Sequence, residues 1–332
     1  MKGCAVVGLG ATRLSDTTLK GKEMGRRVVV LSMAFVLLCV AAFVCPKKVC
    51  ASDYPAAVSE YLRFLKTLDK SDPASVDKAV ERYVTLIASR KKSVCDQGFV
   101  EFLRFYSEVC DTVTLSIDKK FLELSRSSEQ DKGAQQFIQA RDAEIRRYGM
   151  RLDSTEGVWI IAQLPEYIAH AFRPYVSKAV QDYLEIRGKE LDRLFVDDGA
   201  ITIPAEEIGT RLAVWERHLA RFRHSALRKD AVFLYRMYIK AFLTADGYTD
   251  PLGEICTDKS SLPNAWRTYI KDHAGTKSAE ILAGYLDICG REGFRHTLAV
   301  DKYLEKLDTY LDSLGKGPTH AIYLQCYYGV VK

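Results

Sequence analysis

Proline is scarce in this chain, with nine residues among 332, and eight of them lie after residue 51. No low-complexity or proline-rich stretch divides that later part into halves. About 281 residues follow position 51, which is enough to bury a substantial core. We therefore expect one elongated helical domain, or two helical domains packed together.

Recognisable catalytic and metal-binding motifs are lacking as well. The chain has no Gly-x-Ser-x-Gly, no His-Glu-x-x-His and no Cys-x-x-Cys, and its six histidines are scattered. The acidic segment after residue 245 does not fit a calcium loop, because Tyr248 and Pro251 occupy positions that need a ligand and a glycine. The sequence predicts no metal and no cofactor. An enzyme whose site is assembled from residues distant in sequence stays open as an alternative.

An excess of charge of one sign is missing once the first 51 residues are set aside. They hold eight of the 48 basic and two of the 43 acidic residues, so the rest has 40 basic and 41 acidic residues. The formal net charge of +5 therefore comes from the N-terminal segment. Such a balance gives no support to nucleic-acid binding.

Cysteine is present in an odd number after residue 51, at positions 95, 110, 256, 289 and 326. At least one thiol must then stay unpaired within a monomer. Cys95 and Cys110 are expected to flank one helix, about 22 Å apart at 1.5 Å per residue, and should not pair. A Cys256–Cys289 disulfide is an open alternative to buried free thiols.

The N-terminal segment has the pattern of a secretory signal peptide. Arg26 and Arg27 precede residues 28–44, which carry no charge, and a small residue, Ala51, stands at a permissive cleavage position. Cleavage there would make Ser52 the first residue of an exported, periplasmic or secreted protein.

Two further expectations belong to this segment. Met24 is the more natural start for a leader over residues 24–51, so residues 1–23 are expected not to be translated. The alternative to cleavage is a protein anchored in the inner membrane by residues 28–44, although this stretch is short for a bilayer of roughly 30 Å.

The remaining chain predicts a mainly α fold with one small β-hairpin. Helical spacing of apolar residues covers an N-terminal region, 52–148, and a region of helical hairpins, 204–314. Between them, within 149–203, short β-prone runs on either side of residues 153–157 predict a β-hairpin, and residues 201–203 a short third strand. The apolar tail, 315–332, is expected to pack as a strand or extended arm.

The most regular pattern lies in residues 204–246. Ile208, Leu212, Trp215, Leu219 and Phe222 line one side of a helix, with Pro204 at its first helical position and Ser225 as the N-cap of the helix that follows. Two amphipathic helices with so short a connection must fold back on each other as an αα-hairpin. Its predicted core, with that of the next hairpin, comprises Trp215, Leu219, Phe222, Trp266 and Ile270.

A spacing recurs along the chain: an aromatic residue, an aliphatic residue four positions on, and a hydroxyl ten positions on. It occurs as Tyr61/Leu65/Ser71, Trp215/Leu219/Ser225 and Trp266/Ile270/Thr276, with each hydroxyl expected to start the next helix. Over residues 208–242 and 263–290 the chain resembles the tetratricopeptide-like repeats of exported bacterial proteins. It lacks the first-helix glycine and the closing proline of that consensus. The resemblance implies a solenoid of stacked antiparallel hairpins and identifies no activity.

One local excess of basic charge remains, in residues 211–240. A candidate anion-binding or partner-binding face consists of Arg217, Arg221, Arg223, Arg228 and Lys229, and the alternative is the solvated side of two helices. We expect an exported helical-repeat scaffold that presents a surface to a protein or another envelope component. The alternatives are an envelope enzyme and a membrane-tethered structural protein, with membrane contact only through an uncleaved leader.

Overall fold

The computed structural model describes residues 55–125, 130–155, 158–197, 200–244 and 262–315. All of them belong to one compact unit that begins at Tyr54. The predicted leader, Cys256, Cys326 and the apolar tail lie outside these residues. No described helix is both long and apolar enough to cross a membrane.

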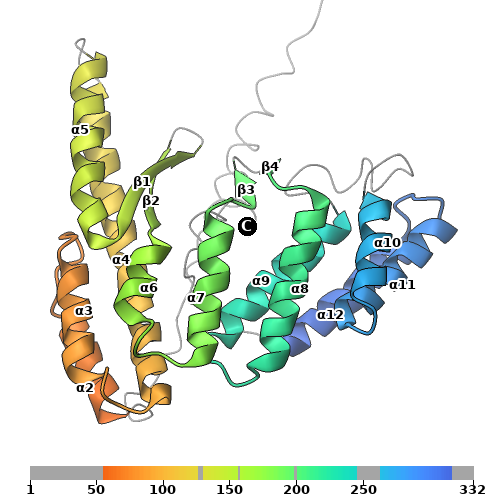
Figure 1. The fold of residues 1–332 in the computed structure, drawn as a ribbon. Coiled ribbons are helices and arrows are strands. Elements are labelled where there is room, and N and C mark those ends of the chain that lie inside the picture. The colour runs from red at the N-terminus through yellow and green to blue at the C-terminus, as the bar shows by residue number, and fades with distance from the viewer. Residues whose placement is uncertain (1–54, 126–129, 156–157, 198–199, 245–261, 316–332) are drawn as a thin grey trace, which may run out of the picture. The chain divides into compact units, whose positions relative to one another are not determined.

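The fold is mainly helical, and helices that follow one another in sequence pack as pairs (Figure 1). The N-terminal helices are α2 (Ala56–Leu65), α3 (Ser75–Leu86), α4 (Lys92–Ser125) and α5 (Gln130–Ile145), followed by a short 3-10 turn, η2 (Arg146–Tyr148). The central helices are α6 (Pro165–Phe172) and α7 (Lys178–Leu191). The C-terminal helices are α8 (Ala205–Arg221), α9 (Arg228–Thr244), α10 (Leu262–Asp272), α11 (Lys277–Arg291) and α12 (Leu298–Leu314). The predicted fold class, stacked antiparallel hairpins with a small β-hairpin, is confirmed.

The N-terminal helices share an aromatic core. Tyr83 of α3 packs edge-on against Phe172 of α6, with ring centroids 4.8 Å apart, and Phe99 of α4 lies 4.9 Å from the same ring. The buried hydroxyls find backbone acceptors: Tyr61 donates to the Ala79 carbonyl at 3.0 Å, and Tyr83 to the Cys95 carbonyl at 3.0 Å. Large rings with satisfied hydroxyls make this packing both stable and specific.

The predicted β-hairpin is present and packs on the long helix α4. Strands β1 (Met150–Thr155) and β2 (Val158–Gln163) pair antiparallel, with Leu152 opposite Ile161. The Ile161 amide donates to the Thr114 hydroxyl of α4 at 3.2 Å, and the Leu152 amide donates to Asp142 of α5 at 2.7 Å. The hairpin therefore joins α4 and α5.

The expected third strand is only partly as predicted. Strand β4 (Ala200–Ile201) pairs with β3 (Val196–Asp197) in a separate two-stranded sheet. This sheet does not extend the β1–β2 hairpin, because both β3 and β4 belong to the connection between α7 and α8. Pro204 likewise stands just before α8, as its N-cap residue, instead of at the first helical position.

The hairpin of α8 and α9 has the predicted apolar interface. Trp215 is fully buried, and its ring lies 5.3 Å from that of Tyr183 of α7. Gly209 lets α8 approach its neighbours, because a Cβ at this position would lie only 3.1 Å from both Phe242 of α9 and Tyr269 of α10. This hairpin is thus packed on both sides.

The hydroxyl of the recurring spacing starts the next helix in one case of three. Thr276 caps α11 by accepting from the Ala279 amide at 3.2 Å. Ser225 accepts from the Leu227 amide at 3.2 Å, inside the turn before α9. At the first repeat Asp72, not Ser71, accepts from the Ala74 amide, at 2.9 Å. The expectation was wrong for these two serines, because each connection uses a different turn.

Candidate functional site

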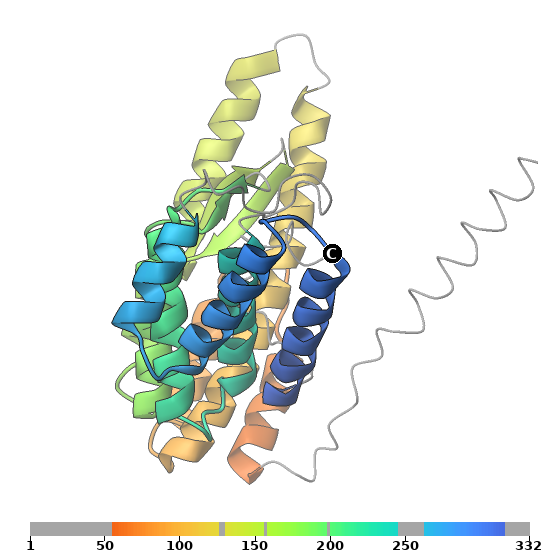
Figure 2. The ribbon, with the colours of Figure 1, turned by 90° about the vertical axis from the view of Figure 1, so that its right-hand side faces the viewer.

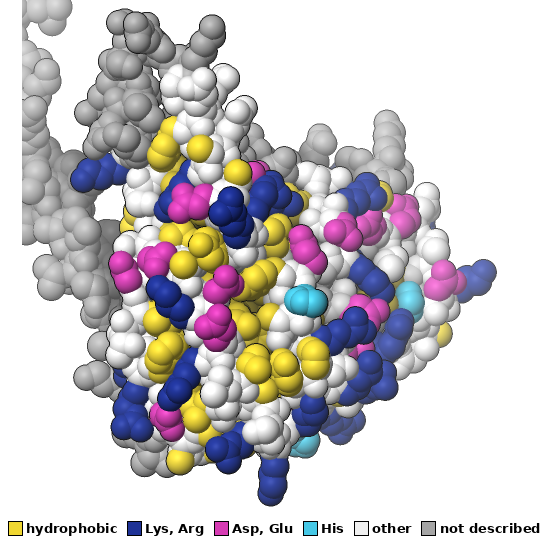
Figure 3. All heavy atoms as spheres, turned by 60° about the vertical axis from the view of Figure 1, so that its left-hand side comes forward, with side chains coloured by type: hydrophobic (Ala, Val, Ile, Leu, Met, Phe, Trp, Pro, Cys, Tyr) yellow, Lys and Arg dark blue, Asp and Glu magenta, His cyan; other side chains and the backbone are white. Residues whose placement is uncertain are grey.

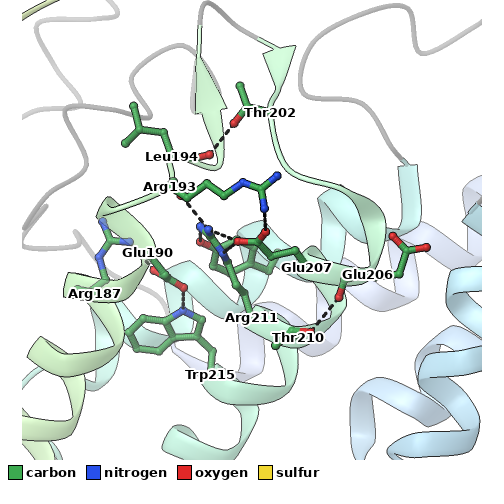
Figure 4. A network of polar contacts seen from close by, with 11 residues as sticks. Arg187, Glu190, Arg193, Leu194, Thr202, Glu206, Glu207, Thr210, Arg211 and Trp215 are labelled. Carbon is green, nitrogen blue, oxygen red and sulfur yellow. Dashed lines mark hydrogen bonds and ion pairs between the residues drawn. The ribbon is translucent and has the colours of Figure 1, made fainter.

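A buried ion-pair network lies between α7 and α8 (Figure 4). Arg187 is fully buried and donates to Glu190 Oε2 at 2.5 Å, one helical turn further along α7. The other oxygen of Glu190 accepts from the indole nitrogen of Trp215 on α8 at 2.6 Å. Both carboxylate oxygens are therefore engaged, which is what a charge in so buried a place requires.

The second half of the network centres on Arg211 of α8, which is 7% exposed. It binds Glu207 at 2.5 Å and the Arg193 carbonyl at 2.8 Å, and Arg193 binds the other oxygen of Glu207 at 2.6 Å (Figure 4). Burial alone would lower the pKa of Arg211, but Tyr238, Glu207 and Glu190 together raise it. Arg211 thus stays charged and ties the α7–α8 connection to α8.

This network defines a structural centre and gives no reaction by itself. Its acceptors are occupied by partners inside the fold, and removing one partner would leave an uncompensated buried charge. Sequence reasoning missed it, because charged residues on a helix are assigned to the solvated face by default. The available signal was that Arg187 lies four positions after Tyr183, among the residues of α7 that face the core.

A second polar pair, a buried histidine with a half-buried aspartate, joins the same two helices. His218 of α8 is 2% exposed, and its Nδ1 lies 2.8 Å from Asp182 Oδ2 of α7. Its ring also packs against those of Trp215 and Phe222, at centroid distances of 5.6 and 5.1 Å. Burial lowers the pKa of His218, an effect that Asp182 partly offsets. The neutral ring then donates from Nδ1 to Asp182 and leaves Nε2 as the unprotonated nitrogen.

His218 Nε2 is shielded from solvent and has no hydrogen-bond partner among the described residues. Within the described ranges, no three His, Cys, Asp or Glu side chains gather as a set that could hold a metal ion. An open hollow at the α6–α7 turn is lined by Ala169, His170, Arg173, Pro174 and Gln181.

The predicted basic face is brought together at the turn between α8 and α9. Arg217, Arg221, Arg223 and Lys229 are exposed, and none of them forms an ion pair with another described residue. Arg228 differs, since it is half-buried and donates to the Leu219 carbonyl at 3.1 Å. Four residues therefore remain as a free cationic surface, and the fifth closes the end of α8.

The predicted core residues occupy three kinds of position. Trp215, Leu219 and Trp266 are buried, with relative exposures of 0, 9 and 0%. Ile270 is half-buried against the core, and Phe222 is half-buried at the end of α8. The Trp266 indole donates to the Phe242 carbonyl at 2.7 Å, which connects α10 to α9. The predicted cleavage position, Ala51 and Ser52, lies outside the described residues.

Comparison with known proteins gives no relative from which a function can be transferred. No protein-family model, no curated protein and no solved structure matches this chain.

Proposed function

We propose that this chain is an exported scaffold of tetratricopeptide-like helical hairpins that binds a macromolecular partner with an acidic surface. The observation that carries the proposal is the cationic surface at the α8–α9 turn. Four exposed basic residues stand there without an acidic partner among the described residues, and the nearby His218–Asp182 pair holds the end of α8 to α7. A rigid support with unpaired charge favours electrostatic capture of an oppositely charged partner.

Export is the second part of the proposal, and it rests on the leader pattern of residues 24–51. An exported scaffold would meet its partner in the envelope or outside the cell. The identity of that partner is best sought in the cells that make the protein.

Site-directed photo-crosslinking tests the proposal. A photoreactive residue at position 224, which is exposed in the turn, should capture a partner in intact cells. The same residue at position 309, exposed on α12, serves as the matched control site. Combined Arg221→Glu and Arg223→Glu substitutions should abolish capture at 224, whereas Lys302→Glu with Lys306→Glu on α12 should leave it unchanged. Equal capture at both sites would argue against a specific surface.

A further inference from the structure

The cationic surface at α8–α9 continues across two neighbouring turns. The turn between α3 and α4, residues 87–91, and that between α6 and α7, residues 173–177, lie at the same end of the helix stack (Figures 1 and 2). Lys92 ties the first to the second, donating to the carbonyls of Pro174 and Tyr175 at 3.0 and 2.7 Å. Asp96 adds a bond from the Ser177 amide at 2.7 Å.

Basic residues crowd these three turns and acidic residues are missing from them. No Asp or Glu occurs in residues 87–95, 172–181 or 217–229. Besides Lys92 and Arg217, which are also exposed, these ranges hold seven exposed basic side chains, here called the basic edge: Arg90, Lys91, Arg173, Lys178, Arg221, Arg223 and Lys229. None of the seven forms an ion pair with a described residue. Lys and Arg side chains gather in the lower part of the face in Figure 3.

The connection between α7 and α8, at the other end of these two helices, carries the opposite sign. Helix α7 begins at the basic edge and α8 ends there. The connection between α7 and α8 therefore lies at the opposite end of both helices. Residues 192–207 contain five acidic residues and a single basic one, Arg193. The chain after residue 51 is nearly neutral, so the basic edge is a local excess, and along α7 and α8 it is opposed by the acidic α7–α8 connection.

The extent of the basic edge decides which kind of partner it fits. Neighbouring helices pack about 8–10 Å apart, so charges on three successive turns spread over a few tens of ångströms. Flexible basic side chains on separate turns do not converge on one small anion. A planar surface with diffuse negative charge can contact all of these side chains at once. A folded acidic protein would instead need a surface whose shape is complementary to all three turns.

We propose that the basic edge docks the protein onto an anionic phospholipid bilayer, with the helices oriented end-on to the lipid headgroups. This inference rests on the export and the cationic surface of the proposed function, and it assigns that surface to the lipid headgroups of the envelope instead of to a macromolecule. The electrostatic attraction to the bilayer would come from the basic edge alone and would orient the protein. The chain after residue 51 as a whole is nearly neutral and adds no net attraction to a negative surface. Docking would leave the acidic α7–α8 connection directed away from the bilayer.

Vesicle flotation with the protein as isolated from the cells that produce it is the test. Vesicles of phosphatidylcholine with phosphatidylglycerol should carry the protein, and vesicles of phosphatidylcholine alone should not. Raising NaCl from about 50 to about 300 mM shortens the screening length from about 13 to about 6 Å and should release it. Lys91→Gln, Lys178→Gln and Arg223→Gln, one from each turn, should each weaken binding about fivefold, and all three together about 100-fold.

Lys302→Gln with Lys306→Gln provides the control, since both lysines are exposed on α12 and unpaired among the described residues. It should change binding less than about twofold if charge position matters. Equal flotation with neutral vesicles would overturn the proposal, and so would a loss confined to Arg223→Gln. Crosslinking of a protein at position 224 without any vesicle binding would overturn the lipid inference while the proposed scaffold function stands.

Discussion

Trp215 connects the apolar core of the α8–α9 hairpin to the buried charges of α7. It is fully buried, and its indole nitrogen is bound to Glu190 at 2.6 Å. Trp215→Ala should lower the free energy of unfolding by about 3–5 kcal/mol, because it creates a large cavity. That loss is a large part of the roughly 5–15 kcal/mol of a typical domain. Urea or thermal melts of the purified variant measure it.

Two variants separate packing from hydrogen bonding at this position. Trp215→Phe keeps most of the apolar volume but leaves Glu190 without the indole donor, so a loss of about 1–3 kcal/mol is expected. Arg221→Ala changes an exposed residue of the same helix and should cost no more than about 0.5 kcal/mol. A Trp215→Ala variant that melts like Arg221→Ala would contradict the core assigned to this hairpin.

The buried His218 makes a prediction about pH. Burial holds its folded pKa below the usual value near 6.5, so the unfolded chain takes up a proton first as the pH falls. The stability that depends on neutral His218 is therefore complete above about pH 6.5 and is lost progressively below it. Bonding of the charged ring to Asp182 limits the loss without reversing it.

Comparison with His218→Gln isolates this contribution. The amide of glutamine can still donate to Asp182, but it does not titrate. Unfolding free energies should fall more for the wild type than for the variant between pH 7.5 and pH 5.5. Parallel pH profiles for the two proteins would show that His218 does not couple folding to protonation.

At the scale of elements, the junction between η2 and β1 depends on a single glycine. Gly149 has φ of +75°, and an added Cβ would overlap the ring of Tyr167 and lie 2.9 Å from the Tyr106 hydroxyl. Tyr167 cannot easily move, because its hydroxyl donates to Asp77 of α3 at 2.5 Å. Gly149→Ala should therefore cost about 2–5 kcal/mol through strain and overpacking together.

Gly275, in the turn before α11, is the matched control. Its φ of +87° is similarly left-handed, but an added Cβ would meet nothing within 4 Å. Gly275→Ala should cost only the backbone term, about 1–2 kcal/mol. Equal losses in denaturant melts of the two variants would show that the contact with Tyr167 does not limit this junction.

Helices were predictable here because their signal is local. Trp215 and Leu219 lie four positions apart, and that spacing alone places both on one helix face. Pro174 stands in the turn between α6 and α7, where a residue that cannot donate a backbone hydrogen bond is a local signal for a break. The pairing of β4 was not predictable from its own residues, because it depends on which neighbour the α7–α8 connection brings within hydrogen-bonding distance.

The candidate surface was predictable only in part, for a similar reason. Arg221, Arg223 and Lys229 stand close together in sequence, so their cluster is visible in the chain. Lys91 and Lys178 are 87 positions apart, and the sequence does not reveal that their turns share one end of the stack. The burial of Arg187 was not predictable either. It requires the ion pair with Glu190 and depends on how α7 packs in the fold.

At the scale of the whole molecule, removal of the predicted leader would change the net charge of the protein. The complete chain has a formal charge of +5 and a sequence isoelectric point of about 8.6. Removal of residues 1–51 takes away eight basic and two acidic residues and leaves a chain with one more acidic than basic residue. Processing at Ala51 should therefore shift the isoelectric point to below about 7, because acidic side chains then balance the basic ones.

Isoelectric focusing and N-terminal mass spectrometry of the protein recovered from its producing cells test this together. Ser52 is expected as the first residue, and a peptide from residues 3–13 should not occur in any fraction, since translation is expected to start at Met24. Recovery of residues 28–51 in a membrane fraction would instead support a tethered protein. In that case the basic edge would act beside an anchor, and its lipid affinity would have to be measured after proteolytic removal of the leader.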